Sequence, residues 1–341
     1  MSFNNFTVPY PVEHPYAKRV AYFSMEFAVH QPLKIYSGGL GFLAGSHMRS
    51  AYELKQNLIG IGILWKYGYY DQERNQDQTL DVAWNEKQYS FLEDTGIRFQ
   101  INVHEHPVWV KVYYLNPETF KSAPLFLLST DVPENDYVSQ TITHRLYDAN
   151  VAILLGVGGA KLMDIIGFNP ELYHLNEAHG LSAAFYLYNK FKNIEDVRKR
   201  LVFTTHTPEE AGNEKHDIYL CHKMSYFCGL SIDEVRKLTG IYDDAFNHSL
   251  VALRFAHLAN GVSQLHGVVA REMWAKYPGV CPIISITNAQ NYRYWADKQL
   301  YRFREAGDDY GIDDRKKYLK RRAFEIVADQ TGKLFDPEVF T

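Results

Sequence analysis

Short apolar runs followed by polar clusters recur along the chain. Six runs have the length and composition of buried strands, at residues 20–24, 58–64, 125–128, 172–175, 201–205 and 282–286. Segments with apolar residues at helical spacing lie between several of them. Residues 75–115 break this rhythm, because small and large apolar residues alternate there as in a half-buried strand. The pattern predicts an α/β protein with an open, mostly parallel sheet and a β-rich excursion at about 75–115.

The polar clusters fall directly after the predicted strands. In an open parallel sheet the carboxyl ends of the strands share one rim, and the ligand crevice lies there. The residues expected on this rim are Glu26, the glycine loop at 37–45, Asp131 to Asp136, Glu177, His179, His206, His266 and Asn288. A single histidine at a strand end is more often structural than catalytic, but this many clusters on one rim indicate a common site.

A glycine-rich loop is the most distinctive stretch. Four glycines lie within residues 38–45, ahead of a helical pattern that places Ala44, Met48 and Ala51 on one face. Such a loop can hold an anion, because glycine lets a ligand approach the backbone and the first N–H groups of a helix are unpaired. The spacing Gly39-x-Gly41-x-x-Ala44 also fits a dinucleotide fingerprint, and a turn that only packs a helix on the sheet is a third interpretation. The loop alone leaves these three readings open.

Composition narrows the class of protein. Of the 341 residues, 46% are hydrophobic and 15% aromatic, which excludes disorder and suggests aromatic-lined clefts. A net charge of −4 argues against nucleic acid or an anionic membrane as a main partner. The three cysteines have no CxxC spacing, so neither a zinc site nor a disulfide framework is predicted. We expect a soluble, cytoplasmic protein, because the Pro-rich start lacks the apolar core of a signal peptide.

The side chains of the rim favour a sugar beside an anion. Histidine and asparagine donate to and accept from hydroxyl groups, carboxylates orient them, and Tyr and Trp cover sugar faces. His104-Glu105-His106 resembles a metal pair, but without further ligands nearby it fits a half-exposed strand edge better. The glycines at 156–159 interrupt a helical run and predict close helix packing, because no strand precedes them.

Six motifs occur in the order in which they are found in the α-glucan (glycogen and maltodextrin) phosphorylases. They are Ser24-Met25-Glu26-Phe27, Ile35 to Gly41, His174-Leu175-Asn176-Glu177, Phe203 to Pro208, Asn260 to Gly267, and Ile286-Thr287-Asn288. From about Tyr16 onward the chain resembles this family, and in particular its short bacterial and archaeal form.

The resemblance implies a Rossmann-like fold, the amino-terminal domain of a two-domain glycosyltransferase of the B type. Such an enzyme holds pyridoxal 5′-phosphate between its domains. It cleaves the terminal glucose of an α-1,4-glucan or maltodextrin with inorganic phosphate and releases glucose 1-phosphate, while the cofactor's phosphate assists proton transfer. The resemblance thus names a substrate, a product and a cofactor for the rim.

The resemblance also assigns residues to roles. The positions that it places at or near the reaction centre are Glu26, Glu177 and His206. Those expected against the glucose and the two phosphates are Gly38, Gly39, Leu40, His179, His206 and Asn288. Gly39 and Trp295 are expected near the cofactor.

The chain departs from the family in three places. Ala289 stands where the family has glycine, and the segment after Leu146-Tyr147-Asp148 is shorter. In the family, the pattern at 336–341 leads into a second domain that carries the Schiff-base lysine. We therefore expect an extended segment at 1–15, a phosphorylase domain at 16–335 and the start of a linker at 336–341. A carboxyl-terminal half or a homodimer is the expected protein partner.

Two hypotheses from different classes compete. In the first, the chain is part of a glucan phosphorylase, and it folds but is inactive alone. In the second, it is a glucan-binding or regulatory module of the same fold without catalysis, which Ala289 and the shortened segment favour slightly. A dinucleotide-dependent oxidoreductase is weaker, because Ile35-Tyr36 makes a poor strand ahead of the glycine loop.

Overall fold

The computed structural model describes residues 3–145, 150–299, 301 and 311–331. They fall into two compact units, 1–289 and 290–341. The first unit contains the predicted strands, and the second contains α12 (Tyr292–Trp295) and α14 (Ile312–Thr331). Residues 146–148 and the expected linker at 336–341 lie outside the described residues. The predicted division at residues 15 and 335 stays a prediction.

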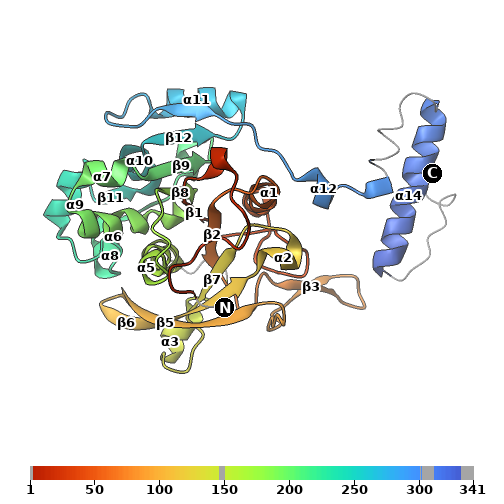
Figure 1. Ribbon diagram of the computed structural model, residues 1–341, viewed down its shortest axis with the longest axis horizontal. Coiled ribbons are helices and arrows are strands. Elements are labelled where there is room, and N and C mark those ends of the chain that lie inside the picture. The colour runs from red at the N-terminus through yellow and green to blue at the C-terminus, as the bar shows by residue number, and fades with distance from the viewer. Residues whose placement is uncertain (1–2, 146–149, 300, 302–310, 332–341) are drawn as a thin grey trace. The chain divides into compact units, whose positions relative to one another are not determined.

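The first unit is built on one large sheet (Figure 1), which has nine strands within the described residues. In spatial order they are β13 (Ile283–Ser285), β12 (Leu258–Gly261), β9 (Leu201–Thr205), β8 (Leu172–Asn176), β1 (Val20–Phe23), β2 (Leu58–Ile63), β7 (Leu125–Ser129), β6 (His106–Leu115) and β5 (Glu93–Val103). All neighbours from β13 to β7 are parallel, and β6 and β5 are antiparallel. The predicted open, mostly parallel α/β sheet is confirmed.

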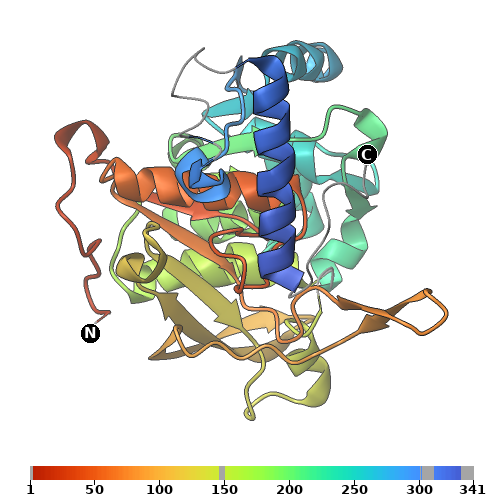
Figure 2. The ribbon, with the colours of Figure 1, turned by 90° about the vertical axis from the view of Figure 1, so that its right-hand side faces the viewer.

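The β-rich excursion joins this sheet rather than standing apart from it. β6 pairs with β7, so the β5–β6 hairpin forms one edge of the main sheet. A separate two-stranded ribbon, β3 (Asp71–Arg74) with β4 (Leu80–Ala83), extends away from it (Figure 2). His104 and Glu105 have φ of 51° and 63° and form the two-residue hairpin turn. The prediction of a strand edge at 104–106 was therefore wrong for these two residues.

Helices occupy both faces of the sheet. Those of the first unit are α1 (Gly39–Glu53), α2 (Pro117–Phe120), α3 (Tyr137–Thr141), α4 (Val151–Ile153), α5 (Gly159–Ile165), α6 (Ser182–Phe191), α7 (Ile194–Arg198), α8 (Ile218–Lys223), α9 (Ile232–Thr239), α10 (His248–Phe255) and α11 (Gln264–Trp274). Short β10 (Lys215–Asp217) pairs with β11 (Ala245–Asn247). Among the described residues, none of the helices is both long and apolar enough to cross a membrane.

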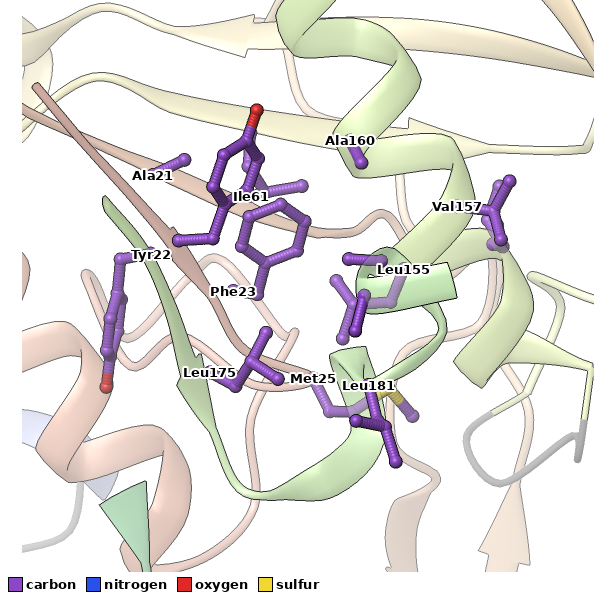
Figure 3. Packing of buried hydrophobic residues seen from close by; sticks show 14 of the residues in the cluster. Ala21, Tyr22, Phe23, Met25, Ile61, Leu155, Val157, Ala160, Leu175 and Leu181 are labelled. Atoms are coloured by element: carbon purple, nitrogen blue, oxygen red, sulfur yellow. The ribbon is translucent and has the colours of Figure 1, made fainter. Parts of the chain in front are cut away.

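The core packs against both faces of β1, the central strand. Phe23 and Ile61 point toward α5 and the π-helical turn Leu154–Gly158, whereas Tyr22 points to the opposite face (Figure 3). A Cβ on Gly159 would lie 2.5 Å from the Phe23 ring, and one on Gly156 would lie 2.1 Å from the Ser182 hydroxyl. These glycines allow close helix packing, as predicted.

The glycines of β2 accept side chains instead of a second backbone. A Cβ on Gly60 would lie 2.7 Å from the Met48 methyl group, and one on Gly62 would lie 2.8 Å from the Phe27 ring. Both neighbours are fully buried. Glycines in the buried run at 58–64 predict the close approach of another backbone. This prediction was wrong, because side chains fill both positions.

Helix α1 is held against the segment after β1 by a backbone contact. A Cβ on Gly45 would lie only 2.0 Å from the Ala28 carbonyl oxygen. The Ala28 N–H in turn donates to the Gly41 carbonyl at 2.9 Å. The position of the glycine loop therefore depends on a contact that only glycine allows.

We expect Gly45→Ala to lower the free energy of unfolding by about 1–3 kcal/mol, because the added methyl group meets backbone that has little room to move. Gly39→Ala is the matched control, since a Cβ there meets no atom within 4 Å. Urea denaturation of both variants measures the effect. Equal stability of the two variants would contradict the packing argument.

Candidate functional site

The strand order reverses at β1. β1 pairs in parallel with β2 on one side and with β8, far along the chain, on the other. Such a reversal leaves a crevice at the carboxyl ends of the two strands, where open α/β folds bind ligands. The segments that enter this crevice are Ser24 to Phe27 after β1 and Glu177 to His179 after β8. The topology therefore places two of the predicted clusters at one switch point.

Glu26 ties the glycine loop to the end of β1. Its carboxylate oxygen Oε2 accepts the N–H groups of Ser37 at 3.0 Å and Gly38 at 3.2 Å. Oε1 accepts the Tyr69 hydroxyl. Glu26 is 5% exposed, so these bonds form in a water-poor setting. The carboxylate expected near the reaction centre thus holds the loop in place.

The glycine loop leaves open space above its first turn. α1 begins at Gly39, and a Cβ on Gly38 or Gly39 would meet no atom within 4 Å. The first-turn N–H groups of a helix have no partner within the helix and lie at the positive end of its dipole. Leu40 packs partly against the core. The open space and the helix amino terminus fit the anion interpretation of the loop, which stays a prediction.

His206 is held by the residues that follow β1 and β8. Its Nε2 lies 2.7 Å from Asn176 Oδ1, and Asn176 Nδ2 donates to Ser24 Oγ at 3.1 Å. Burial is the largest cause that lowers the pKa of His206, to about 4, and His266 and His179 act in the same direction. The imidazole is therefore neutral near pH 7. Sequence reasoning named His206 but missed Ser24 and Asn176 as its supports.

Glu177 combines burial with a strained backbone. Its φ of 64° and ψ of 174° lie in a region that favours glycine, at a cost of about 1–3 kcal/mol. Its carboxylate accepts the N–H of His206 and the hydroxyl of Thr207, the latter at 3.2 Å. Burial raises the pKa of Glu177, although these hydrogen bonds and His179 oppose the shift. Strain and a perturbed pKa together are typical of functional positions.

A short series of contacts leads from His206 to Asn288. His266 lies close enough to His206 to influence its pKa, and Nδ1 of His266 accepts the Val262 N–H at 3.1 Å. The Val262 carbonyl then accepts the N–H of Asn288 at 2.9 Å. Hydrogen bonds therefore link Glu26 and Glu177 to His206, and a second set links Asn288 to His266, which acts electrostatically on His206.

Two separate cavities open beside this linked group. Asn288 lines a cavity of about 270 Å³ together with residues of α1, β8 and β9, among them His47, His174 and Thr204. His179 lines another of about 220 Å³, with Met25, His216 and His248. Asn288 and His179 therefore do not share one hollow in this structure.

Other predicted rim residues have structural partners. Asp131 pairs with Lys66 at 3.0 Å and with His144 at 3.1 Å, and Asp136 caps α3 by accepting the Ser139 N–H. Trp295 lies in α12 of the second unit, so its expected place beside a cofactor stays a prediction. Among the described residues there is no group of three or more His, Cys, Asp or Glu side chains suited to a metal ion.

The fold and the crevice define an open α/β protein. Its candidate site is polar, contains a neutral histidine and lies beside the amino terminus of a helix.

No protein-family model matches the chain. Comparison with known proteins nevertheless finds clear relatives. The chain is 33% identical to the maltodextrin phosphorylase of Thermococcus litoralis over 86% of its own length, and 31% identical to the glycogen phosphorylase of Aquifex aeolicus, also over 86%. The chain is therefore similar in sequence to proteins named as α-glucan phosphorylases, as its motifs predicted.

The chain spans only part of these relatives. It covers 38% of the Thermococcus protein and 46% of the Aquifex protein. It is 45% identical to the uncharacterized protein MJ1631 of Methanocaldococcus jannaschii, of which it covers 63%. The relationship to phosphorylases thus concerns less than half the length of the named enzymes.

Replacing Glu177 by Gln tests the burial of its carboxylate. The folded-state pKa is raised above the unfolded value of about 4.3, so the wild type loses stability as the pH rises through the folded pKa. Gln keeps an oxygen that can accept the His206 N–H but does not ionise. We expect the stability of Glu177→Gln relative to the wild type to increase between pH 4 and pH 8 in urea denaturation. A difference that is constant or falls over this range would contradict the burial argument.

Proposed function

We propose that the strand-end crevice binds the terminal glucose of an α-1,4-glucan, with phosphate beside it, as part of an α-glucan phosphorylase. The observation that carries the proposal is the hydrogen-bonded path from the glycine loop through Glu26, Ser24 and Asn176 to His206. This path fixes an anion-suited loop and a neutral hydrogen-bonding histidine in one structure. The similarity to proteins named glycogen and maltodextrin phosphorylase supports the same assignment.

In this proposal the neutral side chains bind sugar and the loop binds phosphate. His206 and Asn288 exchange hydrogen bonds with hydroxyl groups of the terminal glucose, and Leu40 supplies an apolar surface for the ring. His179 lines the other cavity, from which it exchanges hydrogen bonds with a hydroxyl group that reaches that side. Gly38 and Gly39 let a phosphate approach the first turn of α1. Glu26 and Glu177 act by holding the loop and His206, since their oxygens accept protein hydrogen bonds. The reaction is cleavage of the terminal glucosidic bond by phosphate to give glucose 1-phosphate.

The implied cofactor is pyridoxal 5′-phosphate. The open space at Gly39 and the amino end of α1 fit a phosphate group, so this chain would contact the cofactor there. When bound, the cofactor supplies its phosphate group for proton transfer. Trp295 is the second proposed contact. Because the chain covers less than half of the named phosphorylases, we propose that the covalent lysine comes from a complementary segment or protein.

A glucan-binding module without catalysis is the second candidate. The observation that favours it is the engagement of both carboxylate oxygens of Glu26 by the loop and Tyr69, which leaves that group a structural role. The two candidates share the sugar site and differ in turnover. Binding and activity must therefore be measured separately.

Calorimetric titration with maltopentaose tests the sugar site. We expect His206→Ala and Asn288→Ala to weaken binding about 2- to 10-fold each, the loss of one hydrogen bond of about 0.5–1.5 kcal/mol. His14→Ala is the matched control, because His14 lies exposed in the short helix His14–Tyr16 before β1. Equal affinity in all three variants, or no binding by the wild type, would overturn the proposed sugar site.

Phosphate-dependent release of glucose 1-phosphate from maltodextrin tests the catalytic part. We expect none from this chain alone and measurable release when a separately produced carboxyl-terminal half of a relative and pyridoxal 5′-phosphate are added. Turnover by the chain alone would contradict the need for a complementary segment. Sugar binding without turnover in any combination would select the non-catalytic module.

A further inference from the structure

The Ser24 hydroxyl has a fixed hydrogen-bond direction. Ser24 is fully buried, and its Oγ–H donates to the Glu26 carbonyl oxygen at 2.9 Å. A carbonyl oxygen only accepts, so the single hydroxyl proton is committed to it. The oxygen then accepts from the Glu26 N–H at 3.4 Å and from Asn176 at 3.1 Å. Both lone pairs and the proton of Ser24 are used.

This saturation fixes the orientation of the Asn176 amide. Ser24 has no proton left to give, so Asn176 must turn its NH₂ group toward Ser24 and its Oδ1 toward His206. Asn176 is 1% exposed, so its amide has almost no access to solvent. Because an amide oxygen only accepts, Nε2 of His206, 2.7 Å away, must carry the proton.

We propose that Ser24 and Asn176 are positioning residues that hold His206 in its Nε2-protonated tautomer, so that Nδ1 faces a ligand as a hydrogen-bond acceptor. A neutral histidine carries one ring proton. If one ring nitrogen holds that proton and donates, the other can only accept a hydrogen bond. Nδ1 of His206 has no hydrogen bond within the described residues, and the side chain is only partly buried. The hydrogen bond on the buried side of the ring, between Nε2 and Asn176, therefore determines the tautomer of His206.

The tautomer selects the kind of ligand group that His206 takes. An acceptor nitrogen binds a hydroxyl group that donates its proton, whereas an anion whose oxygens carry no proton, such as sulfate, offers only acceptors and is repelled. The titratable groups around the ring are Glu177, His174, His179 and His266, and the lowered pKa of His206 keeps Nδ1 unprotonated near pH 7. The tautomer of His206 is inferred from hydrogen bonds within this chain. That Nδ1 accepts a hydrogen bond from a glucan hydroxyl rests on the proposed function.

The chain contains a second histidine network that serves as an internal control. His174 Nε2 lies 2.8 Å from Thr204 Oγ1, and the Thr204 hydroxyl donates to Asn260 Oδ1 at 2.7 Å. Because the Thr204 proton is committed to an amide oxygen, His174 must also donate from Nε2. The two networks share no residue, so a substitution in one removes no side-chain hydrogen bond of the other.

Long-range ¹H–¹⁵N spectra of the full chain with labelled histidine test the proposal, because they separate protonated from unprotonated ring nitrogens. The chain has 14 histidines, so His206→Ala and His174→Ala identify the two spin systems by their loss. We expect the wild-type His206 to show a protonated Nε2 and an unprotonated Nδ1. A protonated Nδ1 in the wild type overturns the proposal without any further variant.

Two variants then test the positioning roles. Ser24→Ala frees the Asn176 amide to turn, and we expect the His206 pattern to change to a mixture of tautomers while the His174 pattern stays. For Thr204→Val we expect the opposite result, in which the His174 pattern changes and the His206 pattern stays. Asn176→Asp keeps an acceptor beside Nε2, so it should preserve the tautomer and raise the pKa of His206. An unchanged His206 pattern in Ser24→Ala, or a change of the same size in Thr204→Val, would show that the network does not set the tautomer.

Titration with maltopentaose and with sulfate, an anion that has only acceptor oxygens at pH 7, separates this inference from the proposed function. We expect maltopentaose to move the Nδ1 resonance of His206 and to leave Nε2 protonated, and sulfate to leave Nδ1 unchanged. If the Nε2 tautomer is found but maltopentaose moves nothing, the positioning role stands and the glucan site is overturned. If sulfate moves Nδ1 and maltopentaose does not, the assignment of a donating hydroxyl is wrong.

Discussion

The bond between the Glu26 carboxylate and the glycine loop is the constraint on which the site depends. Hydrogen bonds to a charged group contribute about 1.5–3 kcal/mol, more than neutral ones, and Glu26 accepts from both Ser37 and Gly38. The Glu26 carboxylate already accepts hydrogen bonds from the N–H groups of Ser37 and Gly38. An external anion can therefore bind only to the N–H groups that follow in the chain, beginning at Gly39. The internal carboxylate thus moves the available anion position into the first turn of α1, over the open space at Gly39.

The same glutamate begins the network that reaches the histidine. Its carbonyl orients Ser24, Ser24 orients Asn176, and Asn176 orients His206. Each group in this series is uncharged and is hydrogen-bonded to the next, so burial stabilises one arrangement instead of several. One residue, Glu26, therefore positions both parts of the site. Its carboxylate holds the glycine loop, and its main-chain carbonyl begins the hydrogen-bond series that holds His206. A rearrangement at the end of β1 would change both parts of the crevice together.

Much of this could be read from the sequence, because its main signals are local. Apolar runs such as Leu58 to Ile63 and Leu201 to Thr205 need a buried sheet whatever they pair with, and the polar residues after them must then lie on one rim. The pairing of β6 with β7 was not visible, since antiparallel partners leave no mark on each other's sequence. His104 and Glu105 lack the glycine that usually announces a two-residue turn. Ser24 and Asn176 were within the quoted motifs, but their importance depends on a contact across 152 positions of the chain.

The strain at Glu177 shows what the crevice requires. Glycine at this position would relieve a backbone conformation that costs about 1–3 kcal/mol, yet it would remove the oxygen that accepts the His206 N–H and the Thr207 hydroxyl. A fully buried donor without an acceptor costs about 1–3 kcal/mol, and here two partly buried donors would lose theirs. The hydrogen bonds that the Glu177 carboxylate accepts therefore offset the backbone strain, because they hold the main chain of His206. Asn176 holds the imidazole ring. With main chain and side chain fixed by adjacent residues at the end of β8, His206 has one orientation, and its free nitrogen has one role.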